Sequence, residues 1–149
     1  MIDLLRRLLS RPADAPADPS DARVALAALL VEAAHADGIY DPGERERIAH
    51  VLAVRYGLDD DTASMLCAEG EAAQAEAVDL VRFTRAVKDA VPHEDRVGVV
   101  EALWEVIYAD QHREMHESAL MRKLCGLLHI EDRECGLARQ RVAGRLGLE

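Results

Sequence analysis

The chain repeats itself around two acidic turns, and this duplication limits the folds open to it. Six acids correspond at a constant offset of 73 residues: Glu32 with Glu105, Asp37 with Asp110, and Glu44 with Glu117. In each copy one helical pattern precedes the acids and another follows them. A single pair of repeats is too few for a solenoid, so we expect a compact bundle whose similar halves cover about residues 20–77 and 92–149.

The apolar pattern along the chain is helical throughout. Alanine is abundant and no segment shows the β-branched alternation of a strand, which favours an all-α bundle of about seven helices. Ser20 and Asp41 have the character of helix caps, Gly57 that of a helix end, and Trp104 that of a core anchor. The expected helices cover about residues 20–37, 42–56, 59–77, 79–91, 93–110, 115–128 and 131–146.

The first nineteen residues form a separate segment. Residues 1–10 predict a short amphipathic helix, and residues 11–19 predict a linker because three prolines interrupt it. The helix carries an apolar stripe with two arginines off it: Ile2, Leu5, Leu8 and Leu9, then Arg6 and Arg7. We expect it to dock on this domain or on a protein partner. Weak, reversible attachment to an anionic membrane surface is the alternative.

Composition excludes several classes of function. With 28 acids against 18 bases and a net charge of -10, the chain is a poor nucleic-acid binder. No apolar run approaches the ~20 residues of a membrane span, and the charged opening is too short for a secretory signal, so we expect a soluble protein. Cys67, Cys125 and Cys135 form an odd count without a CxxC pair, which indicates unpaired core cysteines and a cytoplasmic location.

The two acidic turns place carboxylates where a helix end disfavours them. Asp37 and Asp110 follow the end of a helix, whose negative pole costs a carboxylate about 0.3–1 kcal/mol unless a cation compensates. Glu32, Asp37 and Glu44 can converge on a hard cation, calcium or magnesium in preference to zinc. The first turn is not an EF-hand, because Ile48 occupies the twelfth position. Helix capping with solvated acids is the competing interpretation.

The same residues resemble a known family. His35-Ala36-Asp37-Gly38-Ile39, Asp41-Pro42-Gly43-Glu44, and Tyr108-Ala109-Asp110 with Glu117 are similar to the tellurite-resistance TerB-like family, from about residue 20 onward. The resemblance implies a helical bundle of two similar halves, an acidic cluster that binds metal, and a role in bacterial stress responses. It places Asp37 and Glu44 in the first site, Asp110 and Glu117 in the second, and Glu32 and Glu105 on the preceding helices. Gln111 replaces Gly38 in the second turn, which predicts weaker binding there.

Function therefore divides into two hypotheses. The first is a non-enzymatic stress-response module that binds a divalent cation through its acidic turns. The second is a metal-independent module that recruits a protein partner at or near a membrane. A metal-dependent hydrolase lacks support, because the sequence shows neither a general base beside a pocket nor a nucleophile motif.

Overall fold

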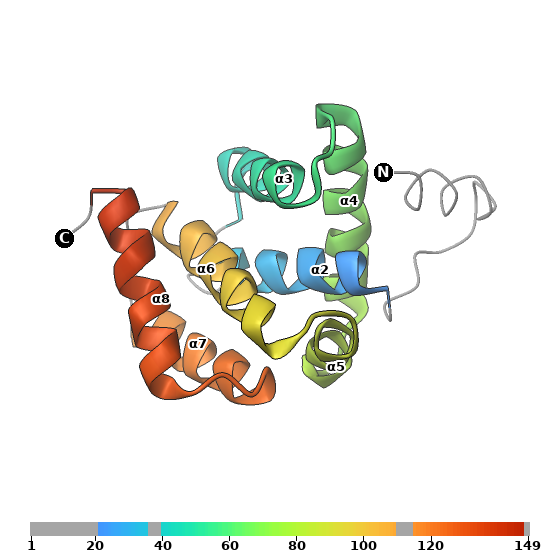
Figure 1. Cartoon of the computed structure of the whole chain (residues 1–149). Coiled ribbons are helices and arrows are strands. Elements are labelled where there is room, and N and C mark those ends of the chain that lie inside the picture. The colour runs from blue at the N-terminus through green and yellow to red at the C-terminus, as the bar shows by residue number, and fades with distance from the viewer. Residues whose placement is uncertain (1–20, 36–39, 110–114, 148–149) are drawn as a thin grey trace.

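Seven α-helices make up the described part of the chain, which a computed structural model gives for residues 21–35, 40–109 and 115–147, with backbone alone at 109 and 115–118. They are α2 (Ala22–Ala34), α3 (Pro42–Tyr56), α4 (Asp60–Glu76), α5 (Val81–Ala90), α6 (His93–Ala109), α7 (Met115–Leu127) and α8 (Asp132–Arg145). These ranges contain no strand, which confirms the all-α prediction (Figure 1). None of these helices is long and apolar enough to cross a membrane.

Helix α2 is the centre of the core. Ten of its thirteen residues are buried, from Val24 to Ala34 with Glu32 excepted. A helix that is apolar on nearly all sides must be surrounded, and α3, α4, α5 and α6 all pack against α2 (Figure 1). The alanines of α2 therefore serve as contact surface for several neighbours.

Small residues let α4 cross α2 closely. A Cβ atom built on Gly70 of α4 would lie 2.5 Å from the Cβ of Ala27 and 2.7 Å from the carbonyl carbon of Ala27. A real Cβ atom does not fit at these distances. The two backbones therefore meet where both helices lack bulky side chains, and this contact sets the spacing of the core.

Capping aspartates begin three of the helices. Asp41 accepts a hydrogen bond from the backbone N–H of Glu44 at 2.9 Å, which confirms its predicted capping role. Asp59 caps α4 in the same way through Thr62, at 2.7 Å. At α2 the cap is Asp21, which accepts from the N–H of Arg23, and not the predicted Ser20. Each cap fixes the point at which the chain enters a helix.

Helices α2 and α3 end in different ways. Gly57 ends α3 in the left-handed conformation with φ 64°, as its position predicted. Helix α2 ends at Ala34, before the expected end near Asp37, and the backbone N–H of the capping residue His35 bonds to the carbonyls of Ala33 and Val31. The first acidic turn therefore begins directly after His35.

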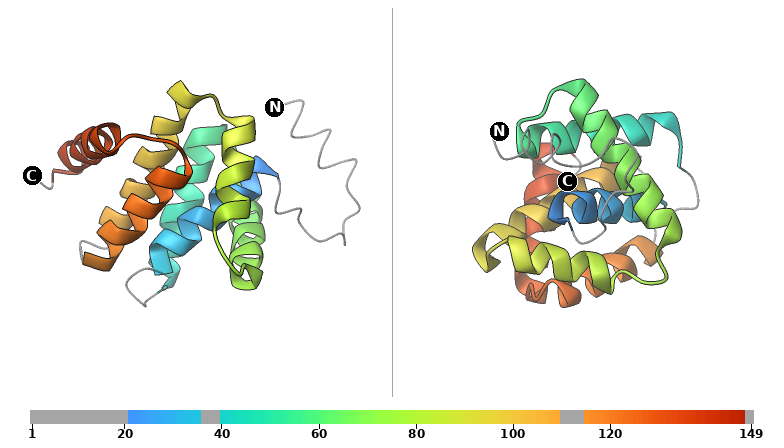
Figure 2. Two further views of the ribbon diagram at one scale, coloured as in Figure 1. Left: turned by 90° about the horizontal axis from the view of Figure 1, so that it is seen from below. Right: turned by 90° about the vertical axis from the view of Figure 1, so that its right-hand side faces the viewer.

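Each half of the molecule has three helices in the same order. Helices α2, α3 and α4 form the first half, α6, α7 and α8 form the second, and α5 joins them. In each half the first helix packs on the third, α2 on α4 and α6 on α8, and the halves meet through α2 and α6 (Figure 2). The two acidic turns thus follow the first helix of each half.

Arg96 of α6 binds the ends of two other helices. Its guanidinium donates to the carbonyl oxygens of Val91 at 3.0 Å and Lys88 at 3.2 Å, at the end of α5. It also donates to the carbonyl oxygen of Leu128 at 3.3 Å, just beyond α7. A cation at a helix C-terminus is favourable, because it meets unsatisfied carbonyls and the negative end of the helix dipole. One side chain therefore connects α5, α6 and α7.

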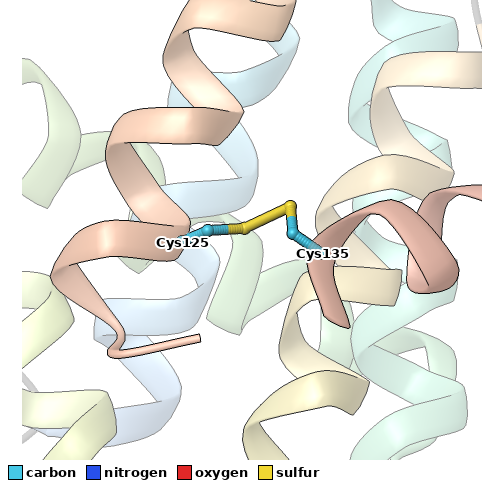
Figure 3. The surroundings of a disulfide bond; sticks show 2 residues. All are labelled: Cys125 and Cys135. Carbon is cyan, nitrogen blue, oxygen red and sulfur yellow. A yellow bond between two sulfur atoms is a disulfide. The ribbon is translucent and has the colours of Figure 1, made fainter. Parts of the chain in front are cut away.

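Cys125 of α7 and Cys135 of α8 form a disulfide, which corrects the prediction that the cysteines are unpaired (Figure 3). Between these helices His129 takes a positive φ of 58°, so that α8 folds back on α7 and the two Cα atoms lie 6.6 Å apart. The spacing of the two cysteines in the sequence does not reveal that α8 runs back along α7. Cys67 is a buried free thiol. The argument from cysteine count to a reducing compartment therefore loses its support.

Candidate functional site

The first acidic turn lies between α2 and α3. Glu32 is half-buried on the last turn of α2, and Glu44 on the first turn of α3 is buried, with 8% of its surface exposed. Asp37 lies outside the described residues. Helices α2 and α3 contact each other, so Glu32 and Glu44 stand on the two elements that flank the turn.

Helix capping accounts for part of this arrangement. Asp41 is exposed and bonds to the N–H of Glu44, as expected of a simple cap. The first turn of a helix also favours the Glu44 carboxylate, because the positive end of the dipole is there. Its burial distinguishes Glu44 from a solvated capping acid, since a carboxylate removed from water needs positive compensation.

The second acidic turn is described less fully. Glu105 is half-buried on α6, as Glu32 is on α2. Asp110 lies outside the described residues, and so does the side chain of Glu117, although its backbone belongs to α7. Among the described side chains, no three His, Cys, Asp or Glu residues gather to hold a metal ion. The six-residue ligand set therefore stays a prediction.

A cluster of polar side chains holds the chain where it leaves the first turn. The phenolic O–H of Tyr40 donates to Glu71 of α4 at 2.6 Å, and the Nε of Arg45 donates to the same carboxylate at 3.3 Å. Arg45 also bonds the hydroxyl and the carbonyl oxygen of Ser64, both at 3.2 Å. We call Tyr40, Arg45, Ser64 and Glu71 the polar clamp. It ties the start of α3 to α4.

The clamp also fixes the two ends of the turn relative to each other. The rings of His35 and Tyr40 stack with 4.6 Å between their centroids, one ring on each side of residues 36–39. Burial, followed by the hydrogen bond to Glu71, raises the pKa of Tyr40 well above its usual range. Tyr40 therefore stays a protonated donor at any physiological pH, and the clamp does not titrate through it.

Sequence reasoning missed the polar clamp. Tyr40 and Glu71 are 31 positions apart, and Glu71 belongs to an Ala- and Glu-rich helix where a single acid carries no signal. The buried Cys67 lies beside the clamp and its thiol contacts the carbonyl oxygen of Arg45 at 3.9 Å. Burial raises the pKa of the Cys67 thiol, so that it is not a thiolate nucleophile.

In the second half, an arginine bonds the tyrosine that lies beside the acidic turn, whereas in the first half a glutamate bonds the tyrosine there. The Nε of Arg139 on α8 donates to the hydroxyl of Tyr108 at 2.9 Å, and its guanidinium lies 5.3 Å from the centre of the Trp104 ring. Trp104 is buried, as its position predicted, and stacks on Tyr108 with 5.6 Å between centroids. Each third helix thus reaches an aromatic residue beside an acidic turn, with a carboxylate in the first half and a guanidinium in the second.

Comparison with known proteins agrees with this architecture. The family described as Tellurite resistance protein TerB matches residues 23–140. The chain belongs to the TerB family. The TerB match begins in α2 and ends in α8, so it includes both acidic turns and leaves residues 1–22 outside. No curated protein and no solved structure matches the chain significantly.

Proposed function

We propose that this TerB chain is a non-enzymatic stress-response module that binds a divalent cation at its first acidic turn. Glu32, Asp37 and Glu44 are the proposed ligands, and calcium or magnesium is the proposed ion, because all three donors are carboxylate oxygens. The observation that supports this most is the burial of Glu44 next to the helix that carries Glu32. Acids that served only as solvated caps would be exposed, as Asp41 is.

The first turn is the stronger of the two proposed sites. In the second half, the guanidinium of Arg139 donates a hydrogen bond to Tyr108, which is two positions before Asp110. A positive charge therefore already lies close to that turn. In the first half Tyr40, three positions after Asp37, is held by a carboxylate. Gln111 also stands where the first turn has Gly38. Glu105, Asp110 and Glu117 are therefore proposed as a weaker second site.

The proposed role of the cation is structural. An ion held by residues of α2, the turn and α3 would join two helices, and metal that binds only the native state stabilises it. The buried Cys67, with its raised pKa, supplies no nucleophile, in line with a non-enzymatic role. The proposed partner is an unidentified protein.

A thermal melt of EDTA-stripped protein tests cation binding. Calcium, magnesium, manganese and zinc are each added at matched ionic strength. A cation at a hundredfold excess over its Kd adds about 2.7 kcal/mol and raises the Tm by roughly 5–11 °C. Asp37→Asn and Glu44→Gln should abolish the rise. Glu46→Gln is the matched control, because Glu46 is exposed on the same helix.

Two results would contradict the metal site. One is the absence of any shift up to millimolar cation, and the other is an equal shift in Asp37→Asn. Either would favour the metal-independent interaction module. In that case Asp37→Asn leaves the fold intact and changes only the affinity for a partner.

A further inference from the structure

A hollow of about 620 Å³ lies between the end of α3, the end of α5 and the start of α6. Its lining combines apolar side chains with charged ones: Tyr56, Val91, Pro92 and Val97 with Arg55, Glu94, Asp95 and Glu101. It lies where the end of α3 in the first half and the end of α5 meet the start of α6 in the second half, away from both acidic turns. The hollow is therefore separate from the proposed cation sites.

The charges around the hollow favour a basic occupant. Glu94 and Asp95 line it from the first turn of α6, and in the described part of the chain neither carboxylate has an ion pair. Glu101, which also lines it, already pairs with Arg141 at 3.2 Å and Arg145 at 2.9 Å. Two carboxylates on one rim thus remain available to an incoming arginine.

We propose that residues 1–10 of this chain dock in the hollow as an amphipathic helix. The stripe of Ile2, Leu5, Leu8 and Leu9 covers the apolar part of the lining, and Arg6, which flanks the stripe on the helix, meets Glu94 and Asp95.

Chain length supports docking within one molecule. Helix α2 begins at Ala22, and Arg23 contacts Tyr56 on the edge of the hollow, so the chain enters the domain there. Residues 11–19 reach at most about 30 Å when extended, and a ten-residue helix is about 15 Å long. The segment therefore reaches the hollow without leaving its own domain. The proposal is independent of cation binding.

Hydrogen exchange and charge reversal on the full chain test the docking. Backbone amides of residues 4–10 should be protected, and Glu94→Arg with Asp95→Arg should lower that protection about tenfold. Adding Arg6→Glu should restore part of it. Asp60→Arg with Asp61→Arg is the matched control, because these exposed acids occupy the first turn of α4 and do not line the hollow.

A zero-length cross-link locates the contact. Arg6→Lys keeps the charge and adds an amine, which carbodiimide should couple to Glu94 or Asp95 within one chain. Cross-links between isotopically labelled and unlabelled chains would overturn the proposal in favour of a second copy. Protection that appears only with phosphatidylserine vesicles would overturn it in favour of a membrane. Exchange at the rate of a free peptide, or an equal loss in the control, would also refute it.

Discussion

Replacing Gly70 by alanine tests whether close contact between α2 and α4 sets the spacing of the core. The new Cβ atom would lie 2.5 Å from the Cβ of Ala27, 2.7 Å from its carbonyl carbon and 3.0 Å from the nitrogen of Ala28. Two of these three atoms belong to the backbone of a helix that is buried on nearly all sides. Neither can move aside by a change of rotamer, so the two helices must separate.

The expected loss of stability follows from two opposing terms. Overpacking a well-filled core costs about 1–3 kcal/mol, and the backbone contacts place Gly70→Ala at the upper end of that range. Alanine recovers about 1 kcal/mol through its higher helix propensity. The net decrease in the free energy of unfolding is therefore about 2 kcal/mol, which lowers the Tm by roughly 4–8 °C in a domain of this size.

Urea unfolding of matched glycine variants measures this effect. Gly136→Ala on α8 is the control, because its new Cβ meets nothing within 4 Å and should stabilise by about 0.5–1 kcal/mol. Ala27→Gly in the Gly70→Ala background should recover part of the loss, since it removes the 2.5 Å contact and leaves the 2.7 Å contact. The reasoning is refuted if Gly70→Ala is as stable as Gly136→Ala.

Two further predictions concern the disulfide and the acid response. Reduction of the bond between Cys125 and Cys135, which are 10 positions apart, should lower the free energy of unfolding by about 3 kcal/mol through loop-closure entropy; an unchanged Tm in a thiol reductant would contradict this. Hydrogen bonds from Thr62 lower the pKa of Asp59, so its contribution to stability is present above the unfolded pKa and disappears as the pH falls through the lower, folded value. Asp59→Ala should therefore reduce the pH dependence of the Tm below about pH 4. If the Tm of the wild type and of the variant fell equally as the pH is lowered, that would argue against the cap.

Local signals in the sequence were sufficient to predict most of the fold. Helical periodicity located every described helix, and the cap at Asp41 and the stop at Gly57 were predicted from residue type alone. These features depend on neighbours within one or two turns, which a single sequence displays directly. The duplication also predicted which helices precede the two acidic turns.

Features that depend on tertiary contact could not be predicted in this way. The burial of α2 on nearly all sides depends on four other helices, and the Cys125–Cys135 bond depends on the return of α8 along α7. Likewise, Glu71 acquires a role only because α4 brings it to Tyr40. Of the candidate metal ligands, the sequence identified Glu44 by type and position, whereas its burial became evident only from the packing of α3.

The three carbonyl contacts of Arg96 have a consequence for how the molecule opens. Because one guanidinium bonds carbonyl oxygens at the ends of both α5 and α7, displacement of Arg96 removes hydrogen bonds from both ends at once. Local unfolding of proteins proceeds in contiguous cooperative units. Arg96 therefore makes the end of α5 and the end of α7 part of one such unit. Slow amide exchange at Val91 and at Leu128 should then report the same opening event.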